Sequence, residues 1–293
     1  MKKNNLNPIY NELLHLKLIK KKNIINISKK TRDKKISVLK DKETKIIFLE
    51  KFITNQNYYS SLKYDSKKVK TLNGNVKTTD LDDDKRRLRQ FQKLCVNKKI
   101  LDFGCGWGGF LTKLKNAKSL NGIELRKECI EHLKKNKKIN VNRSLNNVLG
   151  KFDIITMFHV LEHMPNQTKT LKLLRNKLKK NGKIIIEVPH AEDFLLEFDE
   201  LKEFKEFTFW SEHLILHTFY SLKTILKQVG FRNIKINYFQ RYGFDNHLGW
   251  FIKKKPGGHE FFKDYNSKHL NYNYIQNLIK IKKTDTLIAV AKK

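Results

Sequence analysis

The sequence predicts an α/β fold, a mostly parallel sheet with helices on both faces. From residue 99 onward, short apolar segments typical of buried strands alternate with segments whose apolar residues recur at helical spacing. The first of these strands ends in a glycine-rich turn that leads into a helix. Because βαβ units pair their strands in parallel, this alternation predicts a sheet covered by helices on both sides.

The expected elements of residues 85–293 form one domain. Strands are expected at 99–103, 119–125, 139–142, 152–158, 183–188, 234–239 and 286–291. Helices are expected at 85–94, 110–116, 127–135, 167–179 and 221–229. Two segments interrupt the alternation, at about 191–220 and 240–285, and we interpret them as insertions rich in aromatic and histidine side chains.

Residues 1–84 lack this alternation, and we interpret them as an N-terminal segment that packs on the domain. Apolar residues at helical spacing predict a helix within 10–19, and two strand-like runs at 35–39 and 45–49 predict a hairpin. Residues 54–84 are polar and rich in Asn, Ser, Thr and Asp, so this stretch is interpreted as a connector or a flap.

The chain is strongly basic, with a net charge of +33 over 293 residues. Of the 62 basic residues, 53 are lysines, and these are spread along the chain. Arginine is the better residue for bidentate phosphate contacts, and it is scarce here. We therefore interpret the charge as solvated lysine surfaces and predict no specific nucleic-acid partner.

Apolar segments and cysteines further restrict the class of protein. No run approaches the roughly 20 apolar residues that cross a bilayer. The Met-Lys-Lys start is followed by no apolar segment, so neither a membrane span nor a secretory signal is expected. The three cysteines form no CxxC pair, which excludes a disulfide scaffold or a zinc ribbon. We expect a cytoplasmic protein.

The glycine-rich turn after the first strand is the main functional signal. Gly104, Gly106 and Gly109 allow a tight turn and close approach of the backbone to a ligand. Asp102, at the strand end, would repel a pyrophosphate but suits a ligand that carries an ammonium and a sulfonium group. Glu124 closes the next strand, where a carboxylate can accept both hydroxyls of a ribose. The pattern predicts an S-adenosylmethionine (SAM) site rather than a dinucleotide site.

These residues also have structural explanations. The glycines alone fit a tight strand–helix turn, and Asp102 alone fits a helix cap. Cys105 is better explained as a small buried side chain than as a nucleophile, because the sequence fixes no histidine or basic group beside it. The order of strand, turn, helix and downstream acid favours the functional interpretation.

Five segments together resemble the successive motifs of class I SAM-dependent methyltransferases. They are 102–110, 122–125, 152–155, 158–163 and 182–188. The resemblance covers about residues 85–240 and implies a Rossmann-like sheet, mostly parallel, with one antiparallel strand near the C-terminus. It implies SAM as cofactor and assigns its binding to Asp102, Gly104, Cys105, Gly106, Gly109, Glu124, Leu125, Phe158 and His159.

Further segments resemble a bacterial subgroup of these enzymes that is associated with surface-polysaccharide and sugar modification. They are 31–34, 46–48, 187–190, 207–214, 240–242, 246–248 and 256–259. The resemblance implies a small-molecule or glycan acceptor, and we expect a hydroxyl of a sugar or sugar nucleotide. Aromatic residues of the second insertion, such as Tyr242 and Trp250, either line the acceptor pocket or pack an extra subdomain.

Methyl transfer to a hydroxyl needs in-line positioning and a group that takes up the proton. His163 is the first candidate base, because imidazole titrates near neutrality and Glu162-His163 begins the loop after the fourth strand. His190, which follows the fifth strand, is a second candidate at the mouth of the cleft. Glu162 is a third catalytic candidate. For Glu162, His163 and His190 alike, the pattern also leaves an orienting or loop-stabilising role open.

The sequence predicts no metal site. In ubiquinone-pathway O-methyltransferases a similar Glu-His pair, followed by another acid, is linked to a metal. The matching downstream position here is Asn166, whose amide is a weaker ligand. His213 and His217 have the i, i+4 spacing that shares a helix face, but no third ligand is evident.

Other functions compete with a small-molecule methyltransferase. The main alternative is an RNA-directed methyltransferase, which the net charge motivates. Residues 158–163 lack the Asn/Asp-Pro-Pro-Tyr/Phe loop that is usual in amino-directed base methyltransferases. A non-catalytic SAM-fold binding protein and a dehydrogenase are the remaining alternatives, and cofactor-binding measurements separate them.

Overall fold

The computed structural model describes residues 7–53, 70–71, 74–75 and 81–293. Its centre is a seven-stranded sheet in the order β12 (Arg232–Phe239), β13 (Thr286–Lys292), β10 (Leu178–Pro189), β9 (Phe152–Phe158), β6 (Lys99–Phe103), β7 (Ser119–Ile123) and β8 (Ile139–Asn142). Strands β6 to β10 pair in parallel, whereas β13 is antiparallel to both of its neighbours. The predicted sheet is confirmed.

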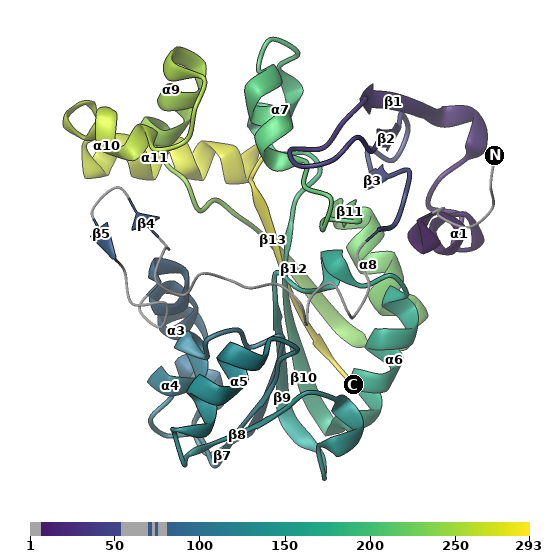
Figure 1. Ribbon diagram of the computed structural model, residues 1–293, viewed down its shortest axis with the longest axis vertical. Coiled ribbons are helices and arrows are strands. Elements are labelled where there is room, and N and C mark those ends of the chain that lie inside the picture. Colours follow the sequence, from purple (N-terminus) through teal and green to yellow (C-terminus); the bar gives the residue numbers. More distant parts are fainter. Residues whose placement is uncertain (1–6, 54–69, 72–73, 76–80) are drawn as a thin grey trace.

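Helices cover both faces of this sheet (Figure 1). One face carries α3 (Asp82–Cys95), α4 (Gly109–Lys113) and α5 (Lys127–Lys134), and the other carries α6 (Gln167–Lys177) and α8 (Phe219–Gln228). In the central strand β9, Ile154, Ile155, Thr156 and Met157 are all buried. Burial from both sides explains why this strand is a continuous apolar run rather than an alternating one.

Several predicted helix boundaries differ from the observed ones, and two of the differences have a clear local cause. The helix predicted at 167–179 ends at Lys177, because Leu178 is already extended and pairs with Phe152 of β9. Asn181 and Gly182 therefore lie within β10 and do not end a helix. The helix predicted within 10–19 is α1 (Pro8–His15), which stops before Lys17, a residue with a left-handed φ of 55°.

A second sheet joins the N-terminal segment to the first insertion. Its order is β1 (Ile24–Ser28), β2 (Val38–Asp41), β3 (Ile47–Leu49) and β11 (Ile215–Leu216). Strands β2 and β3 confirm the predicted hairpin. The carboxylate of Glu12 in α1 accepts hydrogen bonds from the backbone N–H groups of Gln167 and Thr168, at 3.1 and 2.7 Å. It thereby caps the N-terminus of α6 from outside that helix.

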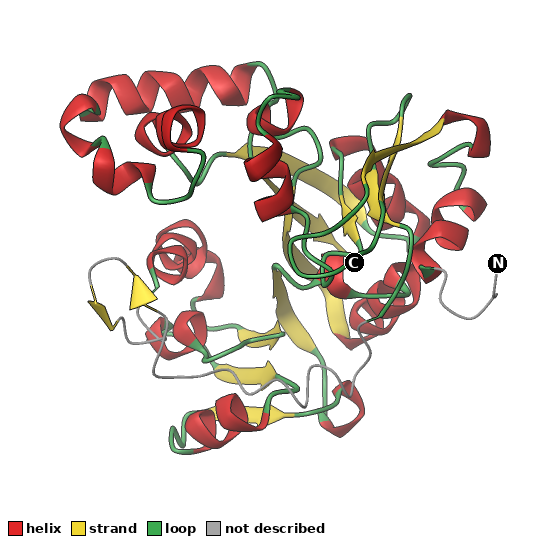
Figure 2. Cartoon of the chain, turned by 45° about the horizontal axis from the view of Figure 1, so that its top comes forward, coloured by secondary structure: helices red, strands yellow, loops and turns green. Residues whose placement is uncertain are grey.

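The remaining elements lie mainly above the carboxyl ends of the parallel strands (Figures 1 and 2). They are α7 (Lys202–Thr208), α9 (Phe244–Lys253), α10 (Gly258–Phe261) and α11 (Lys268–Lys280), with the short strands β4 (Lys70–Thr71) and β5 (Gly74–Asn75) nearby. Trp250 is buried edge-on against Phe204, with ring centroids 5.0 Å apart, so it joins the two insertions. Most of the predicted connector at 54–84 lies outside the described residues.

Short 3-10 turns complete the chain trace. They are η2 (Lys21–Asn23), η3 (Leu145–Asn147), η4 (Leu161–His163), η5 (Phe194–Glu197) and η6 (Lys263–Tyr265). Within the described ranges, each helix is either too short or too polar to span a bilayer.

Candidate active site

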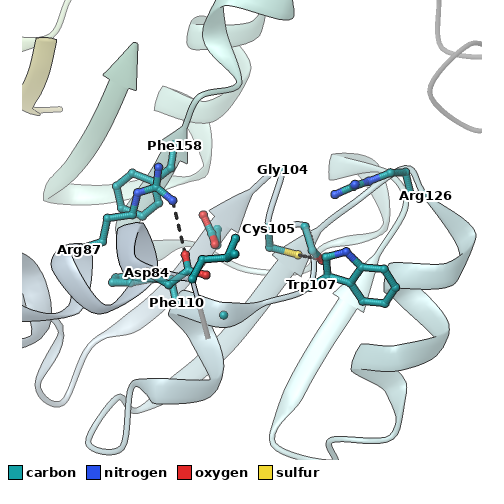
Figure 3. Close-up of a pocket in the computed structure, with 12 residues that line it drawn as sticks. Asp84, Arg87, Gly104, Cys105, Trp107, Phe110, Arg126 and Phe158 are labelled. Carbon is teal, nitrogen blue, oxygen red and sulfur yellow. Dashed lines mark hydrogen bonds and ion pairs between the residues drawn. The ribbon is translucent and has the colours of Figure 1, made fainter. Parts of the chain in front are cut away.

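A cavity of about 350 Å³ lies where β6 and β9 end, beside α3. Figure 3 shows Arg87 and Phe158 on one side of the Gly104 turn, and Trp107 and Arg126 on the other. The lining residues are Leu81, Asp84, Arg87, Asp102, Gly104, Cys105, Gly106, Trp107, Gly109, Phe110, Arg126 and Phe158. The structure thus brings together most of the predicted cofactor residues; Glu124, Leu125 and His159 do not line the cavity.

The turn at the cavity needs glycine for two reasons, which are a left-handed backbone angle and the close approach of a neighbouring side chain. Gly104 has a left-handed φ of +81°, and a Cβ added there would lie 2.4 Å from Cγ2 of Val160. Gly108, the residue before α4, has a φ of +74°. The GxGxxG spacing predicted Gly109, which lines the cavity within the first turn of α4. The same spacing does not include Gly108, so the sequence did not reveal the role of that residue.

Asp102 presents a buried carboxyl group at the cavity. It is 3% exposed, and Oγ1 of Thr156 donates a hydrogen bond to its Oδ1 at 2.6 Å. Burial raises the pKa of Asp102 to about 7, although the bond from Thr156 lowers it. Because burial disfavours the ionised form, a ligand ammonium placed here would stabilise the carboxylate.

Glu124 lies behind the turn and holds it in place. Its Oε2 accepts from the backbone N–H of Gly106 at 2.8 Å, and its Oε1 accepts from the N–H groups of Leu125 and Arg126 at 2.8 and 2.9 Å. The guanidinium of Arg126 also contacts it, with Nε 3.2 Å from Oε1. The carboxylate therefore supports the turn in this structure, and its contact with a ribose stays a prediction.

Helix α3 supplies a side of the cavity that the sequence analysis missed. The guanidinium of Arg87 lies over the ring of Phe158, with Cζ 4.7 Å from the centroid. Arg87 also pairs with Glu187 at 3.0 Å and with Asp84 at 3.4 Å. Helix α3 precedes the recognised motifs, so the sequence predicted a helix at 85–94 but gave no sign that it forms a wall of the cavity.

His159 connects the ends of β9 and β10. Its backbone has a left-handed φ of 53°, and its Nδ1 and Nε2 each lie 3.1 Å from a carboxylate, on Glu162 and Glu187 respectively. Burial lowers the pKa of His159, but these two carboxylates outweigh it and raise the pKa. The structure gives His159 an orienting position next to the cavity residue Phe158.

His163 faces the first insertion beside Glu162. Its Nδ1 lies 2.9 Å from the backbone carbonyl of Glu212, and because a carbonyl only accepts, Nδ1 carries the proton of this bond. The neutral ring then has its lone pair on Nε2. The ring of His213 lies edge-on to that of His163, with centroids 5.1 Å apart, and the Glu162 side chain is fully buried beside them.

The structure also places three other histidines that the sequence analysis considered. His190 is buried, and its Nδ1 donates to the carbonyl of Thr284 at 2.8 Å, so the ring is held inside the protein and not at the mouth of a cleft. His213 and His217 do not share a helix face, because Ile215–Leu216 between them form strand β11. Extended backbone at this point removes the geometry on which the i, i+4 spacing depended.

Comparisons with known proteins agree with this fold. A family model described as a methyltransferase domain matches residues 79–236, more than half of the chain. The chain belongs to this family and contains a methyltransferase domain.

Curated relatives match part of the chain. The mitochondrial ubiquinone biosynthesis O-methyltransferase of Saccharomyces cerevisiae is 41% identical over 86 residues, which cover 25% of this chain and 27% of that protein. The ubiquinone biosynthesis O-methyltransferase of Pelagibacter ubique is 36% identical over 110 residues, which cover 34% of this chain and 45% of that protein. The chain thus matches from about a quarter to less than half the length of these relatives.

Solved structures share the overall fold. A SAM-dependent methyltransferase from Archaeoglobus fulgidus has a TM-score of 0.51 at 24% identity, with 71% of this chain and 92% of that chain covered. The magnesium protoporphyrin IX methyltransferase of Synechocystis PCC 6803, solved with bound SAH, has a TM-score of 0.53 at 12% identity, with 81% and 97% covered. At these identities the likeness establishes the fold alone.

Proposed function

We propose that the protein transfers the methyl group of SAM to a hydroxyl oxygen of a small molecule. The observation that carries this proposal is the position of Asp102, a buried carboxyl group at a glycine turn that leaves a cavity for a ligand. In the proposal, Asp102 faces the ammonium group of SAM, and Phe158 and Arg87 form the opposite wall of the cavity. The partly identical O-methyltransferases support oxygen as the methylated atom.

The chemistry is a single in-line displacement. The acceptor oxygen forms a bond to the methyl carbon while the carbon–sulfur bond of SAM breaks, which leaves S-adenosylhomocysteine. The hydroxyl proton passes to a base, and we assign this role to Nε2 of His163, since Nδ1 is held by the Glu212 carbonyl. Glu162 and His159 position this loop through their hydrogen bond of 3.1 Å.

We propose a sugar hydroxyl as the first acceptor class, on the resemblance to the polysaccharide-modifying subgroup. The arginines beside the site refine this proposal, because each is paired with carboxylates: Arg86 with Asp83 and Glu187, Arg87 with Asp84 and Glu187, and Arg241 with Asp285 and Asp83. Paired guanidinium groups offer little net positive charge to a phosphate. An uncharged glycosyl ring therefore suits the reacting position better than the phosphates of a sugar nucleotide do.

A second candidate acceptor is a hydroxylated aromatic ring. The specific observation that favours it is the partial identity to O-methyltransferases of ubiquinone biosynthesis. Both classes present a hydroxyl group to the same base, so the mechanism is unchanged.

An acceptor screen tests the proposal. The purified chain is incubated with SAM and with parallel panels of free sugars, sugar nucleotides and catechols, and products are detected by mass spectrometry and by S-adenosylhomocysteine release. We expect methylation in one panel and, at limiting SAM, a lower rate in Asp102→Asn. Tight SAM binding without methylation of any hydroxylated acceptor would contradict the assignment of oxygen.

A further inference from the structure

We infer that Glu162, His163 and His213 form a binding site for one divalent transition-metal ion, for which zinc is the best chemical fit. This inference reverses the expectation of no metal site. Its basis is the packing of the first insertion against the loop after β9, which supplies a third ligand that the sequence spacing did not reveal.

The first observation is the geometry of the cluster. One potential ligand atom from each of the three side chains lies within 4.8 Å of the other two. Ligand atoms about 2.1 Å from a tetrahedral ion stand about 3.4 Å apart. Modest rotation of the three side chains would therefore bring their ligand atoms to the distances that an ion requires. The backbone bond from Leu214 N–H to the Glu162 carbonyl, at 2.9 Å, fixes the two segments to each other.

The second observation is that the cluster contains unsatisfied buried atoms. Oε2 of Glu162 and Nδ1 of His213 are both buried, and neither has a hydrogen-bond partner among the residues that the structure describes. Burying a polar atom without a partner is costly, and native proteins rarely retain such atoms without a reason. Oε2 offers a lone pair in the carboxylate, and Nδ1 offers one in the Nε2–H tautomer of the neutral imidazole, so in that tautomer a single cation would satisfy both atoms.

The third observation is that neighbouring groups already orient the candidate ligands. Nδ1–H of His163 donates to the Glu212 carbonyl at 2.9 Å, which directs the lone pair to Nε2. Oε1 of Glu162 is held by Nδ1 of His159 at 3.1 Å, which leaves Oε2 as the remaining oxygen. Metal-binding histidines usually have such a partner on the other ring nitrogen, and ligating carboxylates are likewise hydrogen-bonded.

The donor set determines the class of ion. Two imidazoles and one carboxylate suit zinc and related transition metals, whereas magnesium and calcium prefer oxygen ligands. Three protein ligands leave one coordination position for water or substrate, which is typical of catalytic rather than structural zinc sites. The three cysteines are buried, and none of them contributes a ligand to this set.

One consequence rests on the proposed function. With the ion bound, His163 is a ligand and not a base, and an acceptor hydroxyl at the open position would lose its proton to solvent more readily. Methyl transfer would then depend on the ion, whereas direct proton uptake by His163 would survive chelation.

The test measures metal binding to the full chain without SAM or acceptor. Protein stripped with a chelator is titrated calorimetrically with Zn²⁺, and Co²⁺ is used to record the ligand-field spectrum. We expect one ion per chain, with affinity at least about 100-fold weaker in His213→Gln and in Glu162→Gln. The exposed His259→Gln and the buried His190→Gln are matched controls and should retain wild-type affinity.

Two results would overturn the site: no stoichiometric binding by the wild type, or equal affinity in the cluster variants. Zinc-edge X-ray absorption of the wild type decides the matter if a variant does not fold. It should show only nitrogen and oxygen ligands with two imidazoles, and a sulfur ligand would contradict the site. Failure to methylate any hydroxyl acceptor would refute the proposed function and leave this binding result intact.

Discussion

The cofactor cavity and the Glu162–His163–His213 cluster are assembled in different ways. Much of the cavity comes from one continuous strand–turn–helix, residues 102–110, whose backbone shape creates the space. The cluster needs two segments about fifty residues apart, joined by the backbone bond between Leu214 and Glu162. The difference teaches that a site built within one motif can be found from sequence spacing, whereas a site built by packing requires the fold.

The largest expected effect falls on the acceptor side. His163→Gln should lower the methyl-transfer rate by about 10²- to 10⁴-fold, because it removes either the base or a metal ligand, while SAM affinity stays the same. Steady-state kinetics and SAM calorimetry on the same preparation check this. His190→Gln, which changes a ring held inside the protein by Thr284, is the comparison variant. A matching rate loss in both variants would argue that the assignment to His163 is wrong.

The next prediction tests the cofactor cavity through the backbone conformation of Gly104. Gly104→Ala should weaken SAM binding at least about 100-fold and lower the free energy of unfolding by roughly 3 kcal/mol, from the left-handed φ together with the clash against Val160.

Gly150→Ala is the matched control for this variant. Gly150 has the same φ of +81°, but a Cβ there meets no atom of the described residues within 4 Å. It should lose only about 1 kcal/mol of stability and keep full SAM affinity. Chemical denaturation and calorimetry compare the pair, and similar losses in both would show that the close contact at Gly104 is unimportant.

A smaller effect follows from the charge of Asp102. Asp102→Asn should weaken SAM binding by about 10- to 100-fold, since it removes a charge-assisted contact. In the wild type, SAM affinity should fall by up to about tenfold per pH unit below pH 7, as the carboxylate with a pKa of about 7 takes up a proton.

Stability should follow the opposite trend. The folded-state pKa of Asp102 lies above its ordinary value of 3.8, so the folded chain retains a proton that the unfolded chain loses. Stability from this group therefore decreases as pH rises from about 4 to 7. Asp102→Asn should remove the pH dependence of both SAM affinity and stability. It should also raise the free energy of unfolding at pH 8 by roughly 1–3 kcal/mol. An unchanged pH profile in this variant would assign the titration to another group.

The smallest effect concerns the hydrogen bond that tunes Asp102. Thr156→Val removes the 2.6 Å bond from Oγ1, which lowers the pKa of the carboxyl group. Without it, the pKa should rise further, so the midpoint of the SAM affinity profile should move upward by about one pH unit. A midpoint that stays in place, or moves downward, would show that Thr156 does not tune this group.

The sequence predicted the central sheet well, because continuous apolar runs such as 152–158 identify buried parallel strands directly. It also placed Asp102 and the turn glycines correctly at one cavity. It missed Gly108, whose role depends on a backbone angle, and Arg87, which reaches the cavity from a helix before the motifs. It also misplaced His190, since only the packing of β10 against the Thr284 segment shows where that ring lies.

Calorimetric titration of SAM into the wild type, Asp102→Asn and His163→Gln tests the central claim most directly. The account predicts one SAM per chain in the wild type, an affinity at least about tenfold lower in Asp102→Asn, and an unchanged affinity in His163→Gln. Absence of SAM binding to the folded wild type, or an equal loss in both variants, would contradict the separation of a cofactor cavity from an acceptor-side cluster.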